Sequence, residues 1–226
     1  MPTMPKTFKE EGRFESNPND FYETPLALCE RVWFRIFESL GVPNGNVEVL
    51  DPGSGSGRWG QAAKNVIRKH PKLFQYGTSA WITGVDIRPD AMSSEYQDSY
   101  TYSVTDDFLS RDFKTKYDCV VGNPPYSSET NKRLALDFAL KALSIVKPDG
   151  IVALLYKLEF MAGVNRYKDL FRDNPPHEVW VLGRVPWMKD RKGSNTIDYA
   201  MFVWNFARDG FSAPEIDWML DWRNGC

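Results

Sequence analysis

Residues 46–60, with the sequence NVEVLDPGSGSGRWG, determine the predicted fold class. The first six residues, 46–51, predict a short buried strand because apolar residues dominate them. A glycine-rich turn follows over residues 52–57, and a helix is predicted over Arg58–Lys69, ending before Pro71. A strand that passes through a glycine-rich turn into a helix is typical of the first unit of a parallel α/β sheet.

The same alternation of strands and helices continues on both sides of this stretch. A helix is expected to begin at Thr24-Pro25, with Thr24 as its N-cap, and to end at Gly41. The last two strands, joined by the polar loop from Met188 to Thr196, are expected to form an antiparallel pair at the edge of the sheet. Further strands are predicted over residues 81–86, 100–108, 117–122, 151–156, 178–182 and 199–206, and further helices over 131–146 and 167–172.

These elements predict one α/β domain over residues 1–226, with a Rossmann-like, mostly parallel sheet of seven strands. Helices are expected on both faces of the sheet, and the last strand is expected to be antiparallel. Residues 1–20 are interpreted as a loose N-terminal arm, and residues 207–226 as a C-terminal tail that packs on the body with Trp218 and Trp222.

Composition excludes several classes of protein. The chain has 226 residues, of which 42% are hydrophobic, and no apolar run approaches the roughly 20 residues of a membrane span. Its three cysteines are scattered, without disulfide or zinc spacing, so no metal is expected and a cytoplasmic location is predicted. The net charge is −2, so a nucleic acid would have to bind a local basic face of the molecule.

The glycine-rich turn has two functional interpretations. Gly55, Gly57 and Gly60 match the G-x-G-x-x-G pattern, and Asp86 ends the next strand, where a dinucleotide-binding fold places its ribose-binding acid. An NAD-dependent oxidoreductase is therefore one candidate. A tight turn that merely needs small residues, with Asp86 as a helix cap, is the structural alternative.

The neighbouring residues favour a different cofactor. Asp51, at the end of the strand, would repel a pyrophosphate but would tolerate the ammonium and sulfonium groups of S-adenosylmethionine. Gly53 and Gly55 would let the backbone approach this cofactor, and Asp86 would accept hydrogen bonds from its ribose hydroxyls.

An acidic pair with an aromatic residue ends the third predicted strand. Asp107 is the preferred acceptor for an adenine amino group because it directly precedes Phe108, which would pack on the ring. Asp106 remains the alternative acid, and a turn with solvated charges remains the structural alternative.

Asn123-Pro124-Pro125-Tyr126, directly after the fourth strand, is the most informative motif. The lone pair of an amide or exocyclic nitrogen is delocalised, so such a nitrogen is a poor nucleophile. The Asn123 side-chain oxygen and the Pro124 carbonyl can accept hydrogen bonds from both N–H groups of that nitrogen. This pulls the nitrogen toward a tetrahedral shape and releases its lone pair. The prolines stiffen the turn, and Tyr126 offers a face for stacking a planar group. An ordinary Asn-Pro turn is the structural alternative.

Taken in order, these motifs resemble the S-adenosylmethionine-dependent amino-group methyltransferases, especially the N6-adenine DNA methyltransferases with Asn-Pro-Pro-Tyr. The resemblance extends to about Leu158, and the segment after it is similar to small phage-encoded methyltransferase-like proteins. It rests on Phe21–Pro25, Asp51–Gly57, Gly84–Ile87, Asp107–Leu109 and Asn123–Tyr126.

The resemblance implies a class I methyltransferase fold, S-adenosyl-L-methionine as the cofactor and adenine N6 in DNA as the methylated group. It implies a catalytic role for Asn123, Pro124, Pro125 and Tyr126. The implied cofactor-binding residues are Thr24, Asp51, Pro52, Gly53, Gly55, Asp86, Ile87, Asp107 and Phe108.

The substrate is less narrowly defined than the cofactor. Candidate DNA-binding residues are Arg184, Lys189, Arg191 and Lys192, with Lys132 and Arg133 on the loop after Tyr126, although a solvated hairpin tip would look similar. No segment is long enough for a separate target-recognition domain, so a short or relaxed sequence specificity is expected. An RNA base or a protein glutamine is the alternative substrate, because enzymes acting on them share the Asn-Pro-Pro-Tyr motif. A protein that binds the cofactor without catalysis is a further alternative.

Overall fold

A computed structural model describes residues 23–41, 45–74, 79–91, 98–187, 196–208 and 213–224 of the chain. Within these ranges the strands form one eight-stranded sheet in the order β3-β2-β1-β4-β5-β7-β6-β8. The strands are β1 (Val47–Pro52), β2 (Ala80–Asp86), β3 (Tyr102–Thr105), β4 (Tyr117–Gly122), β5 (Val146–Lys157), β6 (Glu178–Arg184), β7 (Asp198–Asn205) and β8 (Glu215–Trp218).

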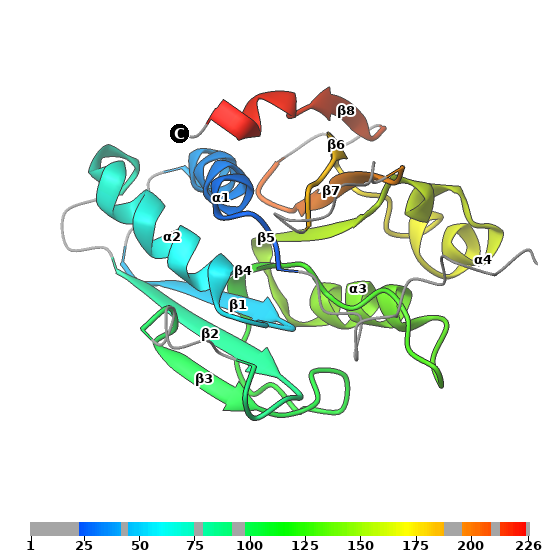
Figure 1. Cartoon of the computed structure of the whole chain (residues 1–226), viewed down its shortest axis with the longest axis horizontal. Coiled ribbons are helices and arrows are strands. Elements are labelled where there is room, and N and C mark those ends of the chain that lie inside the picture. Colours follow the sequence, from blue (N-terminus) through cyan, green and yellow to red (C-terminus); the bar gives the residue numbers. More distant parts are fainter. Residues whose placement is uncertain are drawn as a thin grey trace, which may run out of the picture.

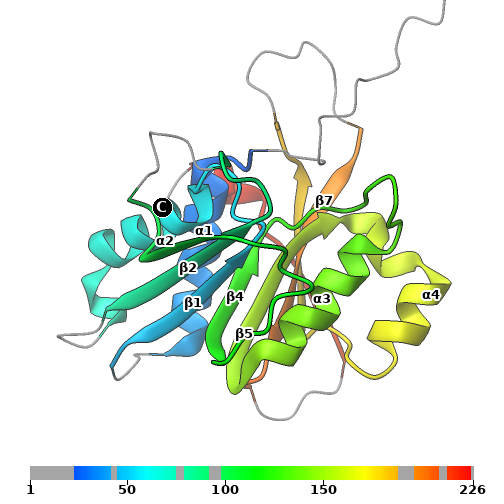
Figure 2. The ribbon, with the colours of Figure 1, turned by 90° about the horizontal axis from the view of Figure 1, so that it is seen from below.

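The first five strands are parallel and place their carboxyl ends along one edge. β1 lies at the centre, with β2 and then β3 on one side and β4 and then β5 on the other. The chain order therefore reverses between β1 and β4, which creates the switch point where α/β proteins bind ligands. Figure 2 shows the carboxyl ends of these strands pointing the same way.

Helices cover both faces of the sheet (Figures 1 and 2). One face is covered by α1 (Leu26–Leu40), α2 (Arg58–Lys69) and the 3-10 helix η6 (Leu220–Asn224). The other face is covered by α3 (Leu134–Ile145), α4 (Val164–Arg166) and the π-helix η5 (Tyr167–Phe171). Two short 3-10 helices, η2 (Pro71–Leu73) and η4 (Leu158–Ala162), complete the elements.

The two faces contain separate apolar cores because side chains alternate across each strand. On the α1 face, Trp33 and Trp180 are fully buried, and the Trp33 indole N–H donates to the carbonyl of Trp59 at 2.9 Å. On the other face, Tyr156 stacks on Phe160 with ring centroids 4.2 Å apart. These packed layers hold the carboxyl edge of the sheet rigid.

The C-terminal part of the sheet corrects three expectations. The prediction of seven strands was wrong because β8 is an eighth. β7 is antiparallel, as expected for the 199–206 strand, and lies between β5 and β6, but it is not the last strand of the chain. The pair of β6 and β7 is not at the edge, because β8 pairs in parallel with the outer side of β6.

β8 was not predicted from the sequence, because all four of its residues are exposed and they form no alternating apolar pattern. Its ladder to β6 and an ion pair of 2.7 Å between Arg35 and Asp217 hold it in place. In the tail, Trp222 is buried as expected, with its indole N–H donating to the carbonyl of Leu182 at 3.2 Å. Trp218 is 63% exposed, so the expectation that it packs on the body was wrong.

The N-terminal start of α1 also differs from the expectation. Its N-cap is Pro25, with no side-chain capping hydrogen bond, so Thr24 does not cap the helix. The arm predicted over residues 1–20 lies outside the described residues. In the ranges given above, no helix combines the length and the apolar character required to cross a bilayer.

Candidate functional site

A cavity of about 430 Å³ opens at the carboxyl ends of β1 to β4, a volume typical of small-molecule sites. The loops after these four strands and the segment before α1 form its walls. Of the candidate cofactor-binding and catalytic residues named from the sequence, those that line it are Thr24, Gly53, Gly55, Asp86, Ile87, Asp106, Asp107, Phe108, Asn123 and Pro125. Separate motifs thus meet around one cavity.

The glycine-rich loop forms one wall of the cavity. Gly53, Gly55 and Gly57 have φ angles of 81°, 52° and 99°, in the left-handed region that favours glycine. The amides of Gly53 and Ser54 donate to the carbonyl of Val85 at 2.8 and 2.9 Å, which ties the loop to β2. The loop can therefore present its backbone to a ligand without an intervening side chain.

Glu23 and Arg58 join the start of α2 to the segment before α1. The Glu23 carboxylate accepts from the Ser56 hydroxyl at 2.8 Å and from the Arg58 guanidinium at 2.7 Å. Both residues line the cavity, although the sequence analysis gave neither a role. Glu23 was part of the Phe21–Pro25 motif, so its position beside Thr24 was the available signal.

The Asp86 carboxylate is held in a fixed orientation at the end of β2. Its Oδ2 accepts from the Gly55 amide at 2.8 Å and from the Arg88 Nη2 at 3.1 Å. Its Oδ1 accepts from the backbone amide and the Nε of Arg88, both at 3.0 Å. A carboxylate has about four acceptor sites, so these contacts fill them.

Asp51 and Pro52 are buried and do not line the cavity. The Tyr100 hydroxyl donates to Oδ2 of Asp51, whereas Oδ1 has no hydrogen-bond partner among the described residues. Only a glycine fits beside it at position 122, because a Cβ there would lie 2.5 Å from Asp51 Oδ1. The pKa of the Asp51 carboxyl is raised from 3.8 to about 7, mainly by burial. The hydrogen bond from Tyr100 lowers this pKa, and the charge of Asp86 raises it.

This pKa makes the stability of the fold dependent on pH. The folded Asp51 carboxyl keeps its proton up to about pH 7, whereas the unfolded one loses it near pH 3.8. The folded state therefore binds more protons between these values, and it loses stability as the pH rises. We expect the parent to lose roughly 2 kcal/mol more than an Asp51→Asn variant between pH 5 and pH 7.5.

Denaturant unfolding of both proteins at the two pH values tests this expectation, because titrating groups that do not interact with Asp51 cancel in the comparison. Equal losses in the parent and in Asp51→Asn would show that Asp51 is ionised throughout that range.

Both residues of the acidic pair after β3 line the cavity. Asp106 accepts from Arg111 at 2.6 Å, and this hydrogen bond lowers the pKa of Asp106. Asp107 accepts from the Leu109 amide at 3.0 Å. Phe108 is 3% exposed and packs against Phe138 with ring centroids 4.8 Å apart, so it contributes an apolar surface to the cavity.

Asn123 directly follows β4 and lines the cavity. Asp86 lines it from the end of β2, and β1 lies between these two strands. Asn123 Oδ1 accepts from the Tyr126 hydroxyl at 2.9 Å, and Asn123 Nδ2 donates to Thr24 Oγ1 at 3.3 Å. These two contacts hold the amide plane and direct its oxygen. The Tyr126 contact was not expected, since the sequence suggested only stacking for this ring.

The loop that follows β4 packs closely on the glycine-rich loop. A Cβ at Gly53 would be in van der Waals contact with Pro125 Cδ, at 3.5 Å, so the two loops are about one methyl group apart. Pro124 is buried, and Tyr126 lines a second, smaller cavity. The four residues of the motif therefore lie at the junction of two cavities.

The residues proposed to bind DNA have different positions. Arg184 is exposed at the end of β6 and lines neither cavity. Lys189, Arg191 and Lys192 lie outside the described residues. Lys132 and Arg133, on the loop before α3, line the second cavity. No group of three metal-ligating side chains occurs in the part of the chain that the structure describes.

Solved structures provide the comparison with known proteins, since no protein-family model and no curated protein matches the sequence. A Listeria monocytogenes protein assigned as a class I S-adenosylmethionine-dependent methyltransferase superposes with a TM-score of 0.65 at 15% identity, over 86% of this chain. The methyltransferase subunit of a type I restriction-modification system from Streptococcus thermophilus gives 0.61 at 17% identity, also over 86%. The chain has the class I methyltransferase fold.

A third similar structure is the M protein of the type I restriction enzyme EcoKI, with a TM-score of 0.55 at 14% identity over 80% of this chain. The chain spans 64%, 46% and 43% of the lengths of these three proteins. The class I methyltransferase fold confirms the expected architecture, a mostly parallel α/β sheet with an antiparallel strand near its end.

Proposed function

We propose that this chain is an S-adenosylmethionine-dependent N-methyltransferase that acts on adenine N6 in DNA. One observation supports this function above the others. The Asn123 side chain lies on the wall of the same cavity as the glycine-rich loop and Asp86. An amide oxygen suited to binding an amino group is thus next to a site suited to a ribose and an adenine.

The residues of the cavity fit this cofactor in chemical character. Asp86 can accept from ribose hydroxyls once the Arg88 guanidinium moves away, and Asp107 and Phe108 offer an acceptor and an apolar surface for adenine. Gly53 and Gly55 leave the backbone open to close approach. When bound, the cofactor supplies an electrophilic methyl group on a sulfonium.

The chain's own contribution to the reaction is orientation of the amino nitrogen. Asn123 Oδ1 has two lone pairs, so it can accept from the target amino group while the Tyr126 hydroxyl occupies the other. Pro124 is buried and does not line the cavity, so its carbonyl would serve as the second acceptor only where the backbone of the loop reaches the amino group. With both N–H groups held by these two acceptors, the nitrogen lone pair would be free to take up the methyl group that the cofactor would supply.

The similar structures from type I restriction-modification systems support DNA as the substrate class. A phage-type origin and a short or relaxed adenine context remain part of the proposal. Transfer of labelled methyl to unmethylated duplex DNA, single-stranded DNA, RNA and protein, measured in parallel, tests the assignment. If methyl were transferred only to a protein glutamine or only to RNA, that molecule and not adenine in DNA would be the substrate. If NADH, and not S-adenosylhomocysteine, stabilised the protein against unfolding, the cofactor would be a nicotinamide dinucleotide and not S-adenosylmethionine.

Arg88 is expected to compete with the cofactor for Asp86. Its guanidinium makes two hydrogen bonds to the carboxylate, at 3.0 and 3.1 Å, so a ribose can bind only after the guanidinium moves away. We therefore expect Arg88→Ala to bind S-adenosylhomocysteine about 10-fold more tightly, or ~1.4 kcal/mol. Isothermal titration calorimetry measures this change.

Arg172→Ala serves as the charge-matched control, because Arg172 pairs with the adjacent Asp173 and lies outside the cavity lining. Weaker binding by Arg88→Ala, with Arg172→Ala unchanged, would mean that Arg88 itself contacts the ligand.

A further inference from the structure

A second cavity, of about 270 Å³, lies on the other side of the Tyr126 loop. Tyr126 and Ser127 form the wall nearest the candidate active site, and Ser127 lines both cavities. Asn123 does not line this second cavity, so the reacting nitrogen would lie outside it. Its floor is aromatic, with Tyr156 and Phe160 both nearly fully buried.

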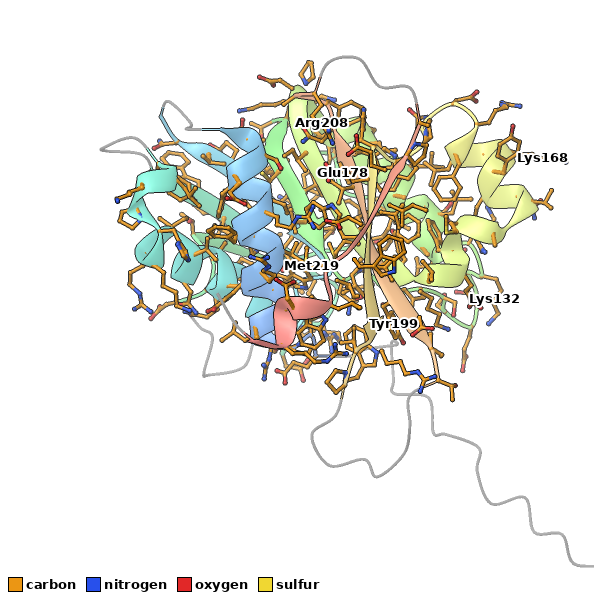
Figure 3. All side chains as sticks on the ribbon, turned by 90° about the horizontal axis from the view of Figure 1, so that it is seen from above. Lys132, Lys168, Glu178, Tyr199, Arg208 and Met219 are labelled. Atoms are coloured by element: carbon orange, nitrogen blue, oxygen red, sulfur yellow. The ribbon has the colours of Figure 1, made fainter. Side chains whose placement is uncertain are left out.

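Basic side chains outnumber acidic ones around this cavity. Lys132, Arg133, Lys157 and Arg166 line it, against Glu159 alone. Figure 3 places Lys132 at the same end of the molecule as Lys168, on the side nearer to Tyr199. Arg133 is neutralised by Asp169 at 2.8 Å, which leaves an excess of positive charge from the other three cations.

The remaining cations donate to carbonyl groups or face an aromatic ring. Lys132 Nζ donates to the carbonyl of Ser128 at 2.9 Å. Arg166 donates through Nε to the carbonyl of Phe160 at 2.5 Å and through Nη2 to that of Glu159 at 2.9 Å. Lys157 Nζ lies 5.9 Å from the centroid of the Tyr126 ring. No carboxylate among the described residues forms an ion pair with any of the three.

The Arg166 guanidinium is held firmly in this cavity. It lies 5.2 Å from the centroid of Phe160, and it fills the space beside Gly163, where a Cβ would be 2.7 Å from its Cζ. A cation fixed in this way loses little conformational freedom when an anion binds, which favours binding. Lys157 projects from the end of β5 toward the same Tyr126 ring.

We infer that this cavity binds a phosphodiester group of the substrate strand, next to the nucleotide whose base reaches Asn123. The inference rests on the proposed function, because it takes the substrate to be a nucleic acid. Lys157 and Arg166 supply the positive charge, and the wall formed by Tyr126 places the bound phosphate beside the reacting base. The net charge of the chain is −2, so such a local site is needed to attract a polyanion.

The test uses a fluorescein-labelled single-stranded oligonucleotide that contains one adenine, with binding measured by anisotropy over a range of salt concentrations. Lys157→Gln should weaken binding about 5- to 10-fold and reduce the salt slope by about 0.7, the value for one phosphate contact on a single strand. Lys168→Gln is the matched control, because this exposed lysine lies outside the cavity lining. The Lys157 side chain makes no hydrogen bond within the described structure, so its replacement should preserve the fold.

A neutral methylphosphonate, placed at one linkage at a time around the adenine, identifies the contact. At one linkage, the methylphosphonate should weaken oligonucleotide binding by the parent but not by Lys157→Gln, because the two changes remove the same interaction. Equal losses for Lys157→Gln and Lys168→Gln, or additive losses at every linkage, would overturn the inference. So would a parent that binds no oligonucleotide.

Methyl transfer and S-adenosylhomocysteine binding are measured separately on the same proteins. A parent that binds the oligonucleotide through Lys157 but transfers no methyl group would refute the proposed function and leave the phosphate site in place.

Discussion

Asn123→Ala is expected to reduce methyl transfer by about 10²–10³-fold, by analogy with the loss of one preorganised hydrogen-bonding group. The variant lacks the oxygen that would accept from the target amino group, so the nitrogen lone pair is no longer directed. S-adenosylhomocysteine affinity should change by less than about threefold. Single-turnover transfer of labelled methyl, together with calorimetric titration of S-adenosylhomocysteine, measures both quantities.

Thr130→Ala is the control for a general disturbance of the loop after β4. Thr130 lines the same cavity, and among the described residues its hydroxyl is within hydrogen-bond distance only of the Ser128 hydroxyl, at 3.4 Å. If Thr130→Ala lost as much transfer as Asn123→Ala, the loop as a whole and not the amide would be responsible. Full transfer by Asn123→Ala would end the proposed role of the Asn-Pro-Pro-Tyr motif.

Asp86→Ala is expected to weaken S-adenosylhomocysteine binding by at least 100-fold. The variant loses the acceptors for the ribose, and it also leaves the Gly55 amide and the Arg88 guanidinium without their shared carboxylate. The parent should be stabilised by about 2.7 kcal/mol at 100 times the dissociation constant, and the variant should lose most of that at the same concentration. Thermal unfolding with and without ligand measures the difference.

Asp90→Ala carries the same change in charge and serves as the control, because Asp90 is exposed and does not line the cavity. The variant must also be compared with the parent in the absence of ligand, to show that the fold survives. An Asp86→Ala protein that is stabilised as strongly as the parent would contradict the ribose assignment.

Sequence patterns were sufficient where an element has a clear chemical start and end. The helix predicted over Arg58–Lys69 and the strand over Tyr117–Gly122 have these bounds in the structure, because glycines and a proline delimit them. β8 was missed because its four residues are exposed and carry no apolar pattern, and because its pairing with β6 is a long-range contact.

In the candidate site, too, some features could be predicted from the local sequence and others depend on long-range contacts. Motifs at the ends of successive parallel strands indicated correctly which loops would meet, because those ends share one edge of the sheet. The burial of Asp51 could not be predicted, since it depends on Tyr100, which reaches it from a distant loop. The contacts of Arg88 with Asp86 and of Tyr126 with Asn123 depend on side-chain rotamers, which sequence spacing does not determine.

The insertion of β7 between β5 and β6 has a consequence for how the protein is made. β5 is synthesised well before β7, and its buried apolar residues Ile151–Tyr156 have no neighbour on one side until Asp198–Asn205 has emerged from the ribosome. β6 emerges in between but joins the sheet only through β7 and β8. An unpaired apolar strand edge is a site of aggregation. The nascent chain therefore needs protection of the β5 edge during this interval, and a chain terminated before Asp198 should aggregate even though the loops after β1 to β4 are complete.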